Sequence, residues 1–173
     1  MRYDLAIIGA GPAGLSAALN ASVRNKNIIL FGVDSPSLTK TAWIDNYLGF
    51  THINGNELNK NFKKSIESRK NIERSNKKIQ QVYAMGDYFS LMLKDNDIIE
   101  ATSVIVATGI DLKKDLKNED EFFAKGVSYC ATCDAALYKG KEVVVIGYNA
   151  ESVEEANFTS EIVGKLTYVN MYK

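Results

Sequence analysis

Short runs of apolar residues alternate with helix-favouring segments near the start of this chain. The runs at residues 5–8 and 28–31 are wholly apolar, and residues 15–23 between them are rich in alanine. A parallel strand covered on both faces is continuously apolar, and alanine has the highest helix propensity. These residues therefore predict a β-α-β unit of about 30 residues.

The middle of the chain predicts a loop, a helix and several strands. Residues 35–50 are turn-rich and are expected to form a loop. Leu58, Phe62 and Ile66 recur every four residues, which gives a helix over residues 57–74 one apolar face. Strand candidates separated by turn residues follow at residues 79–84, 88–94, 97–101 and 104–107.

A second β-α-β pattern occupies the last part of the chain. Its strands are expected at residues 143–146 and 166–169, with a helix at residues 151–163 between them and a short helix before them at residues 135–138. The charged stretch at residues 111–120 lacks apolar periodicity, and we place a domain hinge there.

These elements predict an α/β protein with two domains, residues 1–112 and residues 113–173. A length of 173 residues suffices for one domain and part of another. An apolar fraction of 46% agrees with a globular fold.

Charge and hydropathy exclude several classes of protein. The 21 basic and 21 acidic residues leave no net charge, unlike a nucleic-acid-binding protein. No apolar run approaches the ~20 residues of a membrane span. The N-terminus leads directly into an apolar run and leaves no room for a signal peptide. We therefore expect a cytoplasmic protein that binds neither nucleic acid nor membrane.

One local excess of charge stands out. Residues 56–78 contain eight Lys or Arg residues against three Glu residues. A solvated helix face is the simple interpretation. A docking surface for an acidic protein is the alternative.

The sequence G-A-G-P-A-G at residues 9–14 lies between a predicted strand and a predicted helix. In the dinucleotide-binding fingerprint, the glycine at position 9 permits a tight turn and Gly11 lets the backbone approach a pyrophosphate. Gly14 permits close packing of the helix, whose N-terminus offers free N–H groups to phosphate. A purely structural turn is the alternative, and the strand–turn–helix context favours a nucleotide site.

An acidic residue about 20 positions after this fingerprint commonly binds the ribose. Asp34 is the candidate, because it follows the second predicted strand. An exposed loop aspartate is the alternative interpretation.

The chain has two cysteines, Cys130 and Cys133, in the sequence C-A-T-C-D. Two thiols at this spacing can close a disulfide, and a helix N-terminus would favour the attacking thiolate. Asp134 follows directly and could transfer protons to and from a departing thiolate. A zinc site needs three or four ligands, and only His52 could join the cysteines, from a distant segment. Inert buried cysteines are the second alternative.

Several segments together resemble thioredoxin reductase, a flavoprotein disulfide reductase. They are the G-A-G-P-A-G loop, Asn46 with Gly49, A-T-G at residues 107–109 and G-V-S-Y-C-A-T-C-D at residues 126–134. Each stands in the family's order, and the C-A-T-C-D string is highly specific. The resemblance implies a Rossmann-like FAD-binding domain with a parallel sheet and a β-meander. Part of a second Rossmann-like domain, carrying the cysteines, follows it.

The resemblance also implies roles for individual residues. FAD would lie against residues that match the family's pyrophosphate, ribose, flavin, adenine and strand-end contacts: Gly9, Gly11, Pro12, Ala13, Gly14, Gly32, Asp34, Asn46, Val82, Thr108 and Gly109. By the same resemblance Cys133 faces the flavin and Cys130 exchanges with the substrate disulfide. Asp134 would be the acid/base, the substrate would be a thioredoxin, and the protein would be a homodimer. No metal is implied.

The second glycine loop departs from relatives that use NADPH. They have G-x-G-x-x-A, whereas Asn149 here replaces the second glycine and Glu151 adds a negative charge. A side chain at position 149 should obstruct the pyrophosphate. The relatives' His-Arg-Arg run, which binds the 2′-phosphate, is replaced by N-M-Y at residues 170–172. We therefore expect NADPH not to be the electron donor.

This combination resembles the ferredoxin-dependent flavin thioredoxin reductases, so reduced ferredoxin is the expected donor. The basic residues 56–78 are one candidate contact for it. Two alternatives remain: an NADPH-dependent thioredoxin reductase with a divergent site, and a non-catalytic nucleotide-binding or disulfide-carrying module. Family members continue well beyond the length of this chain, so the expected activity is that of a longer protein.

Overall fold

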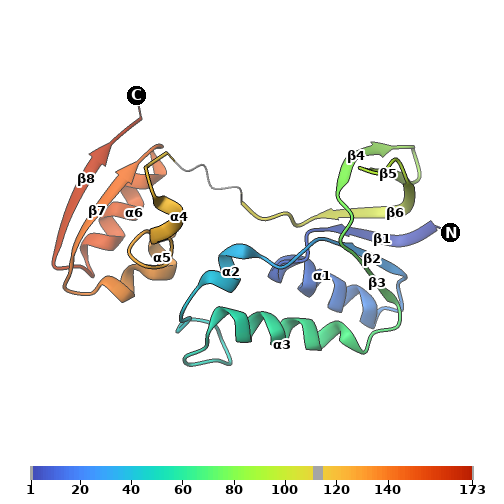
Figure 1. The fold of residues 1–173 in the computed structure, drawn as a ribbon, viewed down its shortest axis with the longest axis horizontal. Coiled ribbons are helices and arrows are strands. Elements are labelled where there is room, and N and C mark those ends of the chain that lie inside the picture. Colours follow the sequence, from blue (N-terminus) through green and yellow to red (C-terminus); the bar gives the residue numbers. More distant parts are fainter. Residues whose placement is uncertain (1, 111–114, 173) are drawn as a thin grey trace. The chain divides into compact units, whose positions relative to one another are not determined.

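The computed structural model describes residues 2–110 and 115–172, and the chain divides into two compact units, Met1–Asp111 and Leu112–Lys173 (Figure 1). Each unit has its own β-sheet. The predicted boundary after residue 112 and the first part of the predicted hinge lie outside the described residues.

The first unit contains a six-stranded sheet in the order β3-β2-β1-β6-β5-β4. Its parallel strands are β1 (Arg2–Ile8), β2 (Ile28–Phe31), β3 (Ile72–Ser75) and β6 (Ile98–Val106). The antiparallel strands β4 (Ile79–Ala84) and β5 (Phe89–Leu93) join β6 to form a β-meander. The predicted α/β fold with a parallel sheet and a meander is confirmed.

Three helices accompany this sheet in the first unit: α1 (Pro12–Val23), α2 (Pro36–Lys40) and α3 (Gly55–Glu67). Figure 1 shows α1 and α3 together on one side of the strands. The predicted apolar face of α3 is confirmed, because Leu58 and Ile66 are buried and Phe62 packs against the core.

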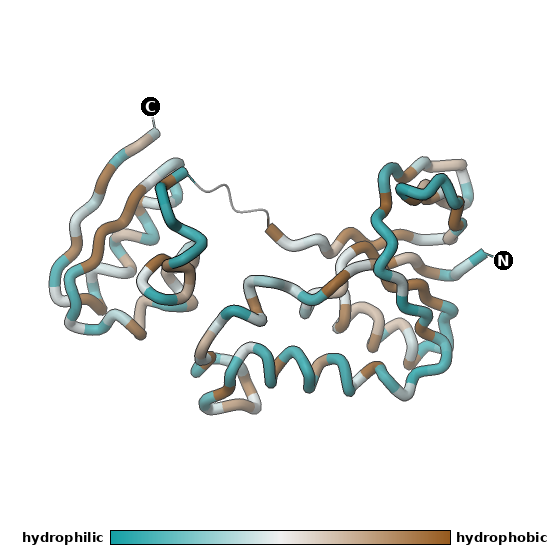
Figure 2. The backbone as a smooth tube through the Cα atoms, in the orientation of Figure 1, coloured by the Kyte–Doolittle hydropathy of each residue, from teal (hydrophilic) through white to brown (hydrophobic). Residues whose placement is uncertain are grey.

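Alternation along β1 and β2 divides the core between the two faces of the sheet. Leu5 and Ile7 of β1 pack with the buried residues of α1 and α3, whereas Ala6 packs on the meander side. Successive side chains of a strand point to opposite faces, so a strand covered on both faces must be continuously apolar. Figure 2 shows hydrophobic residues along these strands and mostly hydrophilic residues along α3.

The predicted helix over residues 57–74 is wrong in its second half. The helix ends at Glu67, and Ile72–Ser75 forms β3, whose residues pair in parallel with Ile28–Phe31 of β2. A four-residue edge strand has too few residues for a period to be recognised in the sequence. The backbone groups of β3 form hydrogen bonds with β2, which lies more than 40 residues earlier in the chain.

Two further boundaries differ from prediction. The strands expected at residues 97–101 and 104–107 are one strand, β6, because β1 pairs with it continuously from Glu100 to Val106 apart from one position. The loop expected at residues 35–50 contains α2, which begins with Pro36 and is capped by Ser35, whose Oγ accepts a hydrogen bond from the Leu38 N–H. Both residues are favoured at a helix start.

The second unit contains the predicted strand–helix–strand pattern. Strands β7 (Glu142–Gly147) and β8 (Lys165–Asn170) pair in parallel, and α6 (Glu151–Ser160) connects them. The short helices α4 (Glu119–Phe122) and α5 (Ala131–Asp134) and the 3₁₀ helix η1 (Ala135–Tyr138) precede this pair. Across residues 2–110 and 115–172, no helix has the length and apolar character to cross a membrane.

Candidate functional site

An open cleft of about 490 Å³ lies in the first unit and is bordered by the residues that follow β1, β2, β3 and β6. Carboxyl ends of parallel strands meet at one edge of a sheet, which is where open α/β sheets bind ligands. Most of the cofactor residues expected from sequence line this cleft: Gly9, Gly11, Pro12, Ala13, Gly32, Asp34, Thr108 and Gly109.

Two of the three fingerprint glycines are closely packed against backbone, and the third is not. Gly9 has a φ of +118°, and a Cβ there would overlap the Ala107 carbonyl oxygen. A Cβ on Gly14 would overlap the Gly9 carbonyl oxygen. The space around Gly11 is open, because the nearest atom to a Cβ there would be Ser35 Cβ at 3.7 Å. Gly9 and Gly14 therefore build the turn, whereas Gly11 leaves room beside the cleft.

The N-terminus of α1 is suited to an anion. Gly11 is its N-cap and Pro12 its first residue, and no side chain caps it. The free N–H groups of a helix N-terminus carry a partial positive charge. A pyrophosphate against residues 11–14 would satisfy these groups.

Asp34 lies at the cleft and is held by a lysine from α3. Lys63 Nζ lies 2.5 Å from Oδ1 and 2.6 Å from Oδ2 of Asp34. The hydrogen bond from Lys63 lowers the pKa of Asp34, with smaller contributions from Asn59 and Arg74 in the same direction. The carboxylate is therefore ionised at neutral pH, as an acceptor for ribose hydroxyls requires. The role of Asp34 as a ribose contact stays a prediction beside the alternative of an exposed loop aspartate, because its side chain remains 43% exposed.

The structure does not bring three of the expected cofactor residues to the cleft lining. Gly14 lies within the first turn of α1, where its role is packing. Asn46 is exposed in the loop between α2 and α3. Val82 is exposed on β4, opposite Leu91 of β5.

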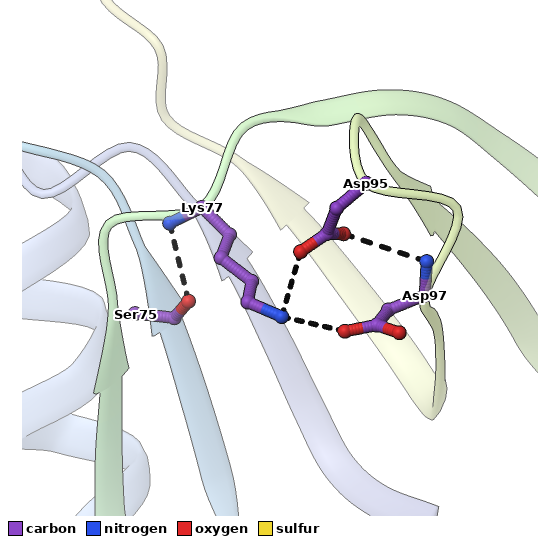
Figure 3. A network of polar contacts seen from close by, with 4 residues as sticks. All are labelled: Ser75, Lys77, Asp95 and Asp97. Atoms are coloured by element: carbon purple, nitrogen blue, oxygen red, sulfur yellow. Dashed lines mark hydrogen bonds and ion pairs between the residues drawn. The ribbon is translucent and has the colours of Figure 1, made fainter.

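The segment that follows β3 lines the cleft with Asn76, Lys77 and Lys78. These residues were counted in the basic segment 56–78 and were not predicted to lie beside a cofactor. Figure 3 shows Lys77 between two aspartates of the β5–β6 turn. Its Nζ lies 2.8 Å from Asp95 Oδ2 and 2.5 Å from Asp97 Oδ2, while its N–H donates to Ser75 Oγ at 3.2 Å. These contacts raise the pKa of Lys77 and lower that of Asp95.

The lysine thus ties the segment after β3 to the meander on one side of the cleft. This contact depends on the register of the β4–β5 hairpin, in which Ile79 pairs with Leu93, and the pattern of residues predicted the strands but not that register.

Cys130 and Cys133 form a disulfide in the second unit, with their Cα atoms 5.3 Å apart. Cys130 is the N-cap of α5, and its Sγ accepts a hydrogen bond from the Cys133 N–H at 3.3 Å. Neither cysteine is buried, so the alternative of inert core thiols is wrong. Among the described residues, no group of three or more His, Cys, Asp or Glu side chains is placed to hold a metal ion.

The residues around the disulfide fix the loop that carries it. Tyr129 donates a hydrogen bond to Glu119 Oε2 at 2.6 Å, and the buried Glu119 also accepts from the Leu116 N–H at 2.7 Å. Burial, together with the hydrogen bond to Glu119, raises the pKa of Tyr129 to about 12. Asp134 is the last residue of α5, and its Oδ2 accepts from Ser128 Oγ at 2.5 Å.

A family model described as pyridine nucleotide-disulphide oxidoreductase matches residues 3–172. The chain belongs to this family. Membership of the pyridine nucleotide-disulphide oxidoreductases implies a flavin, FAD, and the open space at Gly11 and the uncapped N-terminus of α1 fit its pyrophosphate.

Similar curated members of the family are thioredoxin reductases. That of Mycoplasma genitalium is 37% identical over 163 residues, which are 92% of this chain and 51% of the relative. That of Helicobacter pylori is 38% identical over 172 residues, which are 96% of this chain and 55% of the relative. The chain spans about half the length of the curated relatives it matches.

Solved members of the family have the same fold. Thioredoxin reductase from Streptococcus pyogenes is 32% identical with a TM-score of 0.89, over 99% of this chain and 58% of that one. A ferredoxin-flavin thioredoxin reductase from Clostridium acetobutylicum is 54% identical with a TM-score of 0.62, over 100% of this chain and 60% of that one.

The second glycine loop of this family member is filled by its own side chains. Asn149 Oδ1 accepts a hydrogen bond from the Ser152 N–H at 3.0 Å, so this side chain caps the start of α6. Ser152 Oγ lies 2.9 Å from the Tyr168 hydroxyl, and a Cβ on Gly147 would overlap both. One N–H group at the start of α6 therefore already donates to the Asn149 side chain.

Replacing Lys63 by glutamine is expected to produce a small, pH-dependent loss of stability. The pair is partly exposed, and such pairs contribute about 0.5 kcal/mol. Because the folded pKa of Asp34 is lowered, this contribution is present above the ordinary value of 3.8 and is lost as the pH falls through the lower folded value. Denaturant unfolding at pH 7 and at acid pH measures the difference.

The matched control is Lys64→Gln, which removes an exposed lysine from the same helix. A difference between Lys63→Gln and the unsubstituted protein that stays constant from pH 7 down to acid pH would contradict the ion-pair explanation.

Proposed function

We propose that this chain is part of a flavin-dependent thioredoxin reductase that passes electrons from FAD through the Cys130–Cys133 disulfide to thioredoxin. The observation that carries the proposal is the disulfide itself, closed between two accessible cysteines at the start of α5. The similarity to thioredoxin reductases supports it, since their names give the reaction.

The cofactor residues are proposed from the cleft and the family resemblance together. Gly11, Pro12 and Ala13 would hold the pyrophosphate, and Asp34 would accept from the adenosine ribose. The segment 107–109 and Gly32 would border the cofactor, and Gly14 would support the turn. Asn46 and Val82 keep the roles that the resemblance implies, as contacts of the flavin and the adenine outside the cleft lining.

The chemistry of the two cysteines follows from thiol–disulfide exchange. When bound and reduced by the electron donor, the flavin would supply the two electrons that open the Cys130–Cys133 bond, and two protons would complete the dithiol. Cys130 as thiolate attacks the substrate disulfide and forms a mixed disulfide, while one substrate thiol departs. Cys133 then attacks Cys130, which releases the second substrate thiol and closes the original disulfide. Asp134 would supply or accept a proton during these transfers.

Reduced ferredoxin is the proposed electron donor. The Asn149 side chain supports this proposal, because it accepts from the Ser152 N–H at the start of α6, where a dinucleotide phosphate would otherwise accept. The 54% identity to a ferredoxin-flavin thioredoxin reductase supports it as well. The basic residues of the segment 56–78 would be a contact for ferredoxin, since Lys60 and Lys64 are exposed on α3.

The 37–38% identity to thioredoxin reductases that are not named for ferredoxin favours the second candidate, an NADPH-dependent enzyme. Three further expectations remain part of the proposal. A cytoplasmic location and a domain boundary after residue 112 rest on the sequence pattern, and a homodimer rests on the resemblance.

The donor is tested on the complete protein loaded with FAD, without oxygen. NADPH and reduced ferredoxin are added separately, and the flavin absorbance is followed; dithionite serves as the control for a reducible flavin. Bleaching by ferredoxin alone is the expected result. Bleaching by NADPH at a comparable rate would establish the second candidate, and a protein that binds no flavin would contradict both.

A further inference from the structure

The hydroxyl group of Ser128 hydrogen-bonds to both ends of the segment 130–134, which carries the two cysteines. Its Oγ donates a hydrogen bond to Asp134 Oδ2 at 2.5 Å and accepts one from the Cys130 N–H at 3.2 Å. The Cys130 carbonyl oxygen lies farther away, at 3.4 Å. A hydroxyl group has one proton, so the shorter contact to the carboxylate receives it.

Ser128 is held in place by its neighbour in the chain. Tyr129 is bonded to the buried Glu119 and its ring packs 5.8 Å from that of Phe123. Asp134 is the last residue of the four-residue helix α5. The anchored partner in the Ser128–Asp134 contact is therefore Ser128.

We propose that Ser128 is a positioning residue for Asp134, which it aligns for proton transfer at the dithiol. The inference rests on the proposed function, because it assigns Asp134 the acid/base role. Opening the disulfide requires two electrons and two protons, and each exchange with the substrate moves a proton between a thiol and its surroundings. A carboxylate free to rotate performs such a transfer less often than one that is held in position.

Ser128 acts through Asp134, so the effects of the two residues depend on each other. Asp134→Asn removes the group that carries the proton, and general acid/base groups contribute about 10²-fold or more to rate. Ser128→Ala leaves that group in place but unaligned, and a loss of about tenfold is expected. In the Asp134→Asn background, Ser128→Ala has nothing left to align and changes the rate less than about twofold.

The test follows the exchange step alone, on the complete protein. The dithiol is formed with dithiothreitol, the reductant is removed, and a single turnover with oxidised thioredoxin is measured by stopped flow. This readout requires neither the electron donor nor the reaction at the flavin. Unsubstituted protein that reduces no thioredoxin in this assay would contradict the proposed function, whereas the inference about Ser128 depends on the differences among variants.

Three variants accompany Ser128→Ala. Ser128→Thr keeps the hydroxyl group and is expected to restore at least half of the rate. Ser128→Gly repeats the comparison in case the alanine variant is poorly folded. Ser160→Ala is the matched control, because Ser160 is an exposed serine of the same unit whose hydroxyl bonds only the Asn157 carbonyl oxygen within its own helix.

A rate for Ser128→Ala within twofold of the unsubstituted protein would overturn the proposal. A tenfold loss of the same size with Asp134 intact and in the Asp134→Asn background would overturn it as well, because Ser128 would then act independently of the carboxylate. A threonine variant as slow as the alanine variant would also contradict it.

Discussion

Replacing Gly14 by alanine is expected to destabilise the first unit by about 3 kcal/mol and to prevent it from retaining FAD. The added Cβ would overlap the Gly9 carbonyl oxygen and would lie 3.4 Å from Ile7 Cγ2. The Gly9 backbone cannot yield without moving the turn against α1. Because Gly9 itself is enclosed by the Ala107 carbonyl, the displacement would reach the cleft.

Gly11→Ala is the control that separates folding from cofactor binding. Its φ of −77° is ordinary for any residue, and the new Cβ would meet only Ser35 Cβ at 3.7 Å. Its stability is expected to remain within about 1 kcal/mol of the unsubstituted protein. FAD affinity is expected to fall, because the methyl group would enter the space where the pyrophosphate approaches.

Denaturant unfolding without cofactor and titration of flavin fluorescence measure the two effects. Equal stability of the Gly14 and Gly11 variants would contradict the packing argument. Unchanged FAD affinity in both variants would show that the cofactor binds elsewhere.

Cys133→Ser is expected to abolish turnover of thioredoxin, with a loss of about 10³-fold or more, because an essential nucleophile is removed. FAD binding is expected to be unchanged, since the substitution alters none of the residues that line the cleft. The single remaining thiol, Cys130, can still attack the substrate disulfide. The mixed disulfide then accumulates because no second thiol resolves it.

Cys130→Ser is the matched variant for this prediction. It is expected to be equally inactive but to form no covalent adduct, if Cys130 is the cysteine that attacks the substrate. Non-reducing electrophoresis and mass spectrometry distinguish the two variants. An adduct formed only by Cys130→Ser would reverse the roles of the cysteines. Function that survives Cys133→Ser would favour a non-catalytic module that acts through a partner.

Strands whose signals lie within their own residues were predicted correctly, whereas strands that depend on a distant partner strand were not. Residues 28–31 and 79–84 form strands with the predicted limits, because their apolar content and flanking turns are local. The strand Ile72–Ser75 was assigned to a helix, since only its pairing with β2 makes it a strand. The break predicted between residues 101 and 104 is absent for the same reason, because pairing with β1 continues β6 through its polar middle residues.

The amino-acid sequence by itself determined the first glycine loop, the cysteine pair and the family resemblance. Each is a short string whose chemistry depends on neighbours within a few residues, so the spacing alone carries the information. The strand–turn–helix context of residues 9–14 was also readable from local periodicity.

Only the tertiary structure decided which charged and polar groups meet around the cleft and the second glycine loop. Lys63 and Asp34 lie 29 positions apart, and Ser152 and Tyr168 lie 16 apart. Such pairs are created by strand register and helix packing, which depend on the whole sheet and not on local propensity. The contact of Lys77 with Asp95 and Asp97 depends on register as well, here the register of the β4–β5 hairpin.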